Sequence, residues 1–153
     1  MRILFYRGAP LLYLYFLCLS GITRSSPLYL ITLHLTTCSE GSDEKIIEFL
    51  KLFRDATQIV VNRIWSLDTI PSMKTLHKMF YKELRVYGFR AHHAKHVYSY
   101  ARAIVKSARK RNSKKPILRK LTARIDRYDY KLDLESRTLI LKLHNGYEAR
   151  LSC

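Results

Sequence analysis

The spacing of apolar residues changes twice along the chain, and this change most limits the folds available to it. Residues 28–36 alternate between apolar and polar side chains, which predicts a β-strand. Residues 43–111 place apolar side chains three and four positions apart, as amphipathic helices do. Residues 128–151 alternate again. The sequence therefore predicts an α+β fold: a strand, a three-helix insert, and then a three-stranded antiparallel meander.

Capping and turn-forming residues divide the insert into three helices. The first is expected at residues 43–65, where a stripe of apolar residues predicts a face in the core. Ser72 is a suitable N-cap for a second helix at residues 72–87. Gly88 ends that helix and separates it from a third helix at residues 90–111.

Three strands are expected in the C-terminal part of the chain. Asn145-Gly146 predicts a tight hairpin between the last two, because a type I′ turn needs positive φ at both central positions. Asp129 and Asp133 alternate with apolar residues in the first of these strands. This alternation predicts that both carboxylates lie on the solvent side of a half-buried strand.

The expected domain organisation is one compact unit with two parts. Residues 28–37 and 122–153 form the β part, and residues 38–121 form the helical insert with its basic helix and loop. At 48% hydrophobic residues the chain is too apolar to be a disordered basic tail. Its 153 residues are enough to bury one core.

Residues 1–27 are expected to be a separate apolar segment. The uncharged run at residues 8–22 gives it the outline of a secretory signal, but it is shorter than the roughly 18 to 20 residues of a membrane-spanning helix. Cys18, Cys38 and Cys153 form no close pair, which favours a reducing compartment over a disulfide scaffold. We expect an appendage on a cytoplasmic protein. The alternative is a small basic protein that this segment directs to secretion or to a membrane.

Positive charge is concentrated in one stretch of the chain. The formal net charge is +16, from 28 Lys and Arg against 12 Asp and Glu. No acidic residue lies between Glu83 and Asp126, whereas this stretch holds 13 of the basic residues. Five of them, Lys95, Arg102, Lys106, Arg109 and Lys110, fall on one arc of the third helix, beside its apolar arc. A helix face of unrelieved cations favours a polyanionic partner, with nucleic acid ahead of an anionic membrane.

The residue types needed for catalysis are not grouped in a recognisable pattern. His92 and His96 are one helical turn apart, as two zinc ligands on a helix would be, and His93 lies between them. A third ligand is not evident, and the Glu of the helical metalloprotease motif is missing. We expect no catalytic residue, no metal, no cofactor and no small-molecule substrate. A small standalone nuclease that uses the three histidines is the alternative.

Five segments follow one another in an order that resembles the N-terminal part of TnpB/OrfB-type insertion-sequence transposases, which are related to type V CRISPR effectors. The resemblance covers about residues 28–151 and is carried by residues 30–36, IVVNRIW at 59–65, TLHKMFY at 75–81, residues 91–107 with the basic run after them, and YKLDL at 130–134. It implies a wedge-like β-barrel domain with a helical recognition domain inserted in it.

The same resemblance implies a binding function without catalysis. The catalytic acids of that family lie in a downstream RuvC-like nuclease domain, so we expect a truncated, non-enzymatic transposase fragment. It would hold guide RNA, an RNA–DNA heteroduplex or DNA through backbone phosphates. The expected phosphate contacts are Lys95, Arg102, Lys106, Arg109, Lys110, Arg111, Lys114 and Lys115, and the candidate stacking groups are His96 and Tyr100.

Overall fold

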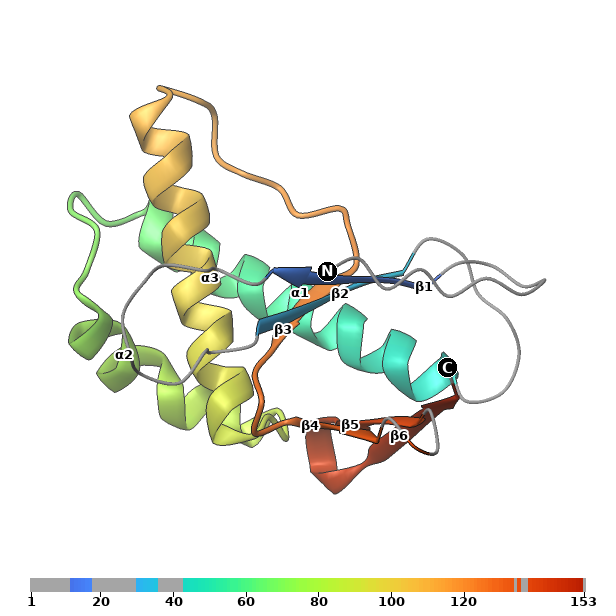
Figure 1. Cartoon of the computed structure of the whole chain (residues 1–153). Coiled ribbons are helices and arrows are strands. Elements are labelled where there is room, and N and C mark those ends of the chain that lie inside the picture. Colours follow the sequence, from blue (N-terminus) through green and yellow to red (C-terminus); the bar gives the residue numbers. More distant parts are fainter. Residues whose placement is uncertain (1–11, 18–29, 36–42, 134, 136–137, 153) are drawn as a thin grey trace, which may run out of the picture.

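Three helices separate two groups of strands along the chain, as Figure 1 shows. The structure is a computed structural model, and it describes residues 12–17, 30–35, 43–133, 135 and 138–152. The three cysteines lie outside these residues. In chain order the elements are β1 (Leu12–Leu17), β2 (Leu30–Leu35), α1 (Asp43–Trp65), α2 (Met73–Val86), α3 (Ala91–Lys110), β3 (Thr122–Ile125), β4 (Tyr130–Asp133), β5 (Thr138–Lys142), a 3₁₀ turn (His144–Gly146) and β6 (Glu148–Ser152). The α+β class and the order of three helices before a meander are confirmed.

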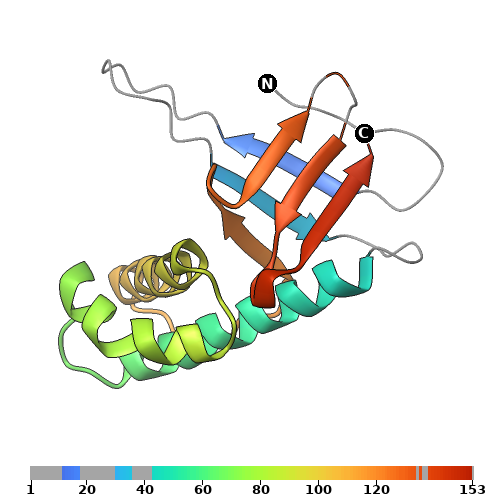
Figure 2. The ribbon, with the colours of Figure 1, turned by 90° about the horizontal axis from the view of Figure 1, so that it is seen from below.

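The strands form two antiparallel sheets of three strands each. In the first, β2 lies between β1 and β3, and Leu33 is paired with both Leu14 and Ala123. The second is the meander β4-β5-β6. The sheets lie in two layers whose strands cross when seen from below (Figures 1 and 2). Ile125 of β3 and Leu141 of β5 are fully buried in the same hydrophobic core.

Two strands of the first sheet fall where the sequence analysis placed none. Strand β1 takes six residues from the segment 1–27, which we expected to be an appendage. Strand β3 has only four residues, with Ala123 and Ile125 buried and their neighbours half-buried. A run this short shows too little alternation to stand out from a basic loop. The β part therefore includes residues 12–17 as well as the expected ranges.

Helix α1 connects the helical insert with the sheets. Its apolar stripe, which includes Ile46, Phe49, Phe53, Val60 and Ile64, is buried along the whole helix, as the spacing predicts. The helix packs on α3 and on β3. In Figure 2 one end of α1 lies beside the sheets and the other beside α2 and α3. The insert and the β part therefore share one core.

The ends of α2 and α3 follow the expected chemistry. The Ser72 hydroxyl accepts a hydrogen bond from the Thr75 amide at 3.2 Å and caps α2. At the end of α3, Asn112 has φ +49°, and the amide of Ser113 donates to the Ala108 carbonyl at 3.0 Å. This is the Schellman arrangement that ends helices. No helix in the described part of the chain is long and apolar enough to cross a bilayer.

The Asn145-Gly146 turn has the predicted geometry. Both residues have positive φ, +53° and +76°, and the Tyr147 amide donates to the His144 carbonyl at 3.1 Å. The Asn145 amide also donates to the carbonyl of Gly88 at 2.9 Å. This second bond attaches the β5–β6 hairpin to the connection between α2 and α3.

Candidate nucleic-acid interface

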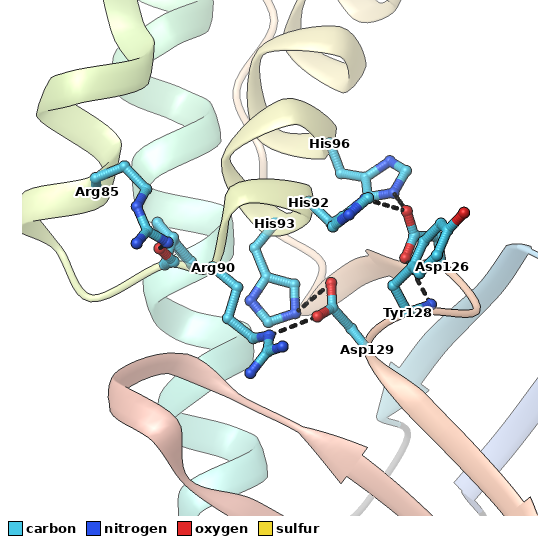
Figure 3. Close-up of polar contacts among 9 residues, drawn as sticks. Arg85, Arg90, His92, His93, His96, Asp126, Tyr128 and Asp129 are labelled. Atoms are coloured by element: carbon cyan, nitrogen blue, oxygen red, sulfur yellow. Dashed lines mark hydrogen bonds and ion pairs between the residues drawn. The ribbon is translucent and has the colours of Figure 1, made fainter.

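The two ends of α3 differ in their electrostatic surroundings. At the N-terminal end, Arg90, His92 and His96 meet the carboxylates of Asp126 and Asp129, as Figure 3 shows. Negative groups are stabilised near a helix N-terminus. Toward the C-terminal end, no ion pair joins α3 or the following loop to any other described residue. Positive charge at that end is stabilised by the helix dipole but not by a carboxylate.

Eight exposed cations, which we call the cationic strip, continue from α3 into the loop that follows it. This loop returns from the far end of α3 to β3 as an extended segment (Figure 1). None of the eight has an ion-pair partner among the described residues. The cationic strip consists of Lys95, Lys106, Lys110, Arg111, Lys114, Lys115, Arg119 and Lys120.

Arg102 and Arg109, which the sequence analysis placed among the phosphate contacts, bind backbone carbonyls inside the insert. Arg102 Nε donates to the Pro71 carbonyl at 2.9 Å. Arg109 donates to the carbonyls of Trp65 at 3.1 Å and Asp68 at 3.0 Å, and also to that of Leu67. The Trp65 carbonyl is one that the end of α1 leaves without a helical partner, and the other carbonyls belong to the α1–α2 connection. Both side chains are half-buried, so the structure gives them a positioning role between α3 and the α1–α2 connection.

The loop of the cationic strip is held against α1 by a side-chain amide. Gln58 Oε1 accepts from the Leu118 amide at 2.7 Å, and Gln58 Nε2 donates to the Pro116 carbonyl at 3.1 Å. These two bonds resemble one step of a β-ladder, with the carboxamide in place of a neighbouring strand. They fix the part of the loop that leads to Arg119 and Lys120.

The two candidate stacking groups are only partly exposed. His96 Nε2 lies 3.3 Å from Asp126 Oδ2, and burial lowers the pKa of His96. The ring of Tyr100 is packed against the core, and the Arg124 guanidinium lies 4.4 Å from its centre on one face. Both residues belong to α3. His96 contacts Asp126 near the N-terminal end of the helix, whereas Tyr100 lies beside the loop of the cationic strip.

Asp126 contacts His92, His96 and the backbone of Tyr128. His92 Nδ1 lies 2.8 Å from Asp126 Oδ2, and the His92 ring stacks on Tyr128 with centres 4.6 Å apart. Asp126 Oδ1 accepts from the Tyr128 amide at 3.0 Å. The described residues contain no group of three or more His, Cys, Asp or Glu side chains that could hold a metal ion.

Asp129 is fully buried, so the prediction that it faces solvent was wrong. Arg90 Nε donates to Asp129 Oδ1 at 2.7 Å, and His93 Nε2 lies 3.3 Å from Oδ2 without hydrogen-bond geometry. The alternation does not extend this far, because the Asp129 amide closes a turn on the Asp126 carbonyl at 3.0 Å. Burial raises the pKa of Asp129 against the opposing effect of Arg90, and burial lowers the pKa of His93 to about 3.

Comparison with known proteins assigns no family to this arrangement. No family model matches the chain, and no curated protein or solved structure matches it. The resemblance to TnpB/OrfB-type transposases therefore stays a prediction from the sequence.

Proposed function

We propose that this chain binds RNA or DNA through the phosphate backbone, along the cationic strip. The observation that carries the proposal is the contrast within α3. Its N-terminal end has carboxylate partners, whereas the eight exposed cations of the strip have none among the described residues. Like charges on one helix face repel, and a line of phosphates relieves this repulsion while releasing counterions.

The fold favours this use of the strip because hydrogen bonds hold the backbone that carries it in place. The Schellman arrangement at Asn112 and the two Gln58 bonds hold the loop at both ends. Arg102 and Arg109 fix the side of α3 that carries Lys106 and Lys110. A loop whose backbone is already fixed loses less conformational entropy on binding than a mobile one.

The proposal includes the more specific partners that the TnpB/OrfB resemblance implies. These are guide RNA, an RNA–DNA heteroduplex or DNA, recognised by backbone geometry while base pairing reads the sequence. Three helices between strands are consistent with a helical insert of that kind. We assign no residue to base reading.

The test compares two quadruple variants that remove the same charge. The strip variant replaces Lys106, Lys110, Lys114 and Lys115 with Ala. The control replaces Lys51, Lys74, Lys78 and Lys82, which are equally exposed but lie on α1 and α2. Binding of a labelled single-stranded RNA of about 20 nucleotides is measured as a function of salt. The strip variant should lose about 0.7 in the magnitude of the salt slope for each phosphate contact removed, and the control should keep the wild-type slope. Equal losses in both variants would mean that the strip has no special role.

A further inference from the structure

A pocket of about 340 Å³ lies between α1, α3 and the loop of the cationic strip, next to Arg119 and Lys120. Its volume is at the lower end of the range of about 300 to 1,000 Å³ for small-ligand sites. Thr57 and Tyr100 line it from the two helices, and Ile117 and Leu118 line it from the loop. The pocket therefore opens beside cations that the proposed function already uses.

The lining of this pocket combines apolar side chains with positive charge. The ring of Tyr100 and the side chains of Ile117 and Leu118 supply the apolar part. Arg54, Arg119 and Lys120 supply three cations, and none of the described carboxylates lines the pocket. Arg54 forms an ion pair with Asp55 at 2.8 Å. Arg119 and Lys120 have no ion-pair partner among the described residues. A ligand with a planar ring and an attached anion fits this combination.

Tyr100 supplies an aromatic ring to the pocket. Packing against the core holds it on one side, and Arg124 lies over one of its faces at 4.4 Å. Tyr100 lines the pocket, whereas Arg124 does not. A base stacked on such a ring contributes about 1 to 3 kcal/mol to binding of single strands.

The loop wall of the pocket is fixed before any ligand arrives. Gln58 binds the backbone on both sides of Ile117, at the Pro116 carbonyl and the Leu118 amide. On the helix side, the buried Thr57 hydroxyl donates to the Phe53 carbonyl at 2.6 Å. The pocket is thus formed by two elements with their own internal hydrogen bonds.

We propose that this pocket holds one nucleotide of a bound single strand, with its base against Tyr100 and its phosphate beside Arg119 and Lys120. This inference rests on the proposed function and adds a defined nucleotide site to the backbone contacts. It also implies that a single strand is preferred over a duplex, because a paired base cannot reach the ring.

The experiment uses two labelled single strands of equal length and charge, poly-dT of about 12 nucleotides and its abasic analogue. The chain is tested as wild type, as Tyr100→Leu and as Tyr100→Phe. The Leu variant should bind poly-dT about tenfold to a hundredfold more weakly but the abasic strand unchanged, while the Phe variant keeps the wild-type affinity. Tyr87→Leu, which removes an exposed ring at the C-cap of α2 that does not line the pocket, is the matched control and should change neither affinity.

The outcomes separate this inference from the proposed function. Salt-sensitive binding of both strands by wild type, with no effect of Tyr100→Leu on poly-dT, overturns the nucleotide site and leaves the cationic strip standing. Absence of any binding by wild type overturns both. Displacement of the strand by micromolar TMP would assign the pocket to a free nucleotide instead and overturn the strand-bound form.

A second measurement avoids dependence on the folding of the variant. Wild-type protein is irradiated with a strand that carries 5-iodouracil, and the cross-linked peptide is sequenced. The cross-link is expected at Tyr100. Cross-links only at exposed rings outside the pocket, such as Tyr147, would contradict the inference.

Discussion

His93 is a histidine that the fold keeps neutral. It is fully buried beside Phe49, with ring centres 4.9 Å apart, and Arg90, Asp129 and His96 surround it. Burial lowers its pKa to about 3, so below its ordinary pKa of about 6.5 the unfolded chain takes up a proton that the folded chain does not. The contribution of His93 to stability is therefore fully present above about pH 6.5 and is lost progressively as the pH falls toward 3.

Urea unfolding at about pH 7 and about pH 5 measures this effect. The wild-type free energy of unfolding should fall by about 2 kcal/mol between these conditions because of His93 alone. His93→Leu should remove most of this loss, whereas His77→Gln, on the exposed side of α2, should keep it. The raised pKa of Asp129 makes the protein more stable as the pH falls, and the lowered pKa of His96 makes it less stable, as for His93. The effect of His93 is therefore read from the difference in pH dependence between the variant and the wild type. An unchanged pH dependence in His93→Leu would contradict this account.

Arginine and lysine have different roles on the same arc of α3. Helical spacing places Arg102, Lys106 and Arg109 on one arc of α3. The planar guanidinium of Arg109 reaches several carbonyls at the end of α1, while the Lys106 ammonium stays in solvent. Spacing gives the direction of a side chain but not which carbonyls lie within its reach. For this reason the sequence alone could not distinguish positioning arginines from exposed lysines.

At the scale of elements, Gly88 connects the helical insert with the meander. Its φ is +80°, and its carbonyl accepts the Asn145 amide. A Cβ at this position would overlap Asn145 Oδ1 and come within 2.6 Å of Asn145 Cγ. Gly146 also has positive φ, but no atom of the described residues lies within 4 Å of a Cβ placed there. Comparing alanine substitutions at the two positions therefore distinguishes the cost of backbone strain from the cost of steric overlap.

Gly88→Ala should destabilise the protein more than Gly146→Ala. Positive φ alone costs an alanine about 1 kcal/mol at either site. At Gly88 the exposed Asn145 side chain must also rotate away from the new methyl group, which should add about 0.5 to 1.5 kcal/mol. Thermal unfolding of the two variants measures the difference. Equal unfolding midpoints of the two variants would mean that the contact between position 88 and the Asn145 side chain does not affect stability.

Elements with strong local signals were predicted well. The bounds of α1, the Ser72 cap and the Asn145-Gly146 turn depend on residues close in sequence, and all three are confirmed. Strand β1 and the burial of Asp129 depend on partners far along the chain. The sequence does contain one signal for the contact of Asp129. Asp126 and Asp129 are the first acidic residues after the acid-free basic stretch, which makes them candidate ion-pair partners for its cations. Alternation outweighed that signal, because period two says nothing of where a strand begins.

The whole molecule separates its charges along α3. Asp126 and Asp129 join the β part to the start of the helix, and all of the cationic strip except Lys95 lies farther along, where no described carboxylate makes an ion pair with it. The same helix therefore attaches the insert to the sheets at one end and presents cations at the other. A net charge of +16 alone would not indicate this polarity.

The dependence of nucleic-acid affinity on salt tests the central claim most directly. The association constant of the wild-type chain for a single-stranded RNA is measured from about 50 to about 500 mM salt, with two unrelated sequences. Four to eight phosphate contacts predict a plot of log K against log salt with a slope of about −3 to −6, nearly the same for both sequences. A slope near zero, or no binding at the lowest salt, would contradict the account.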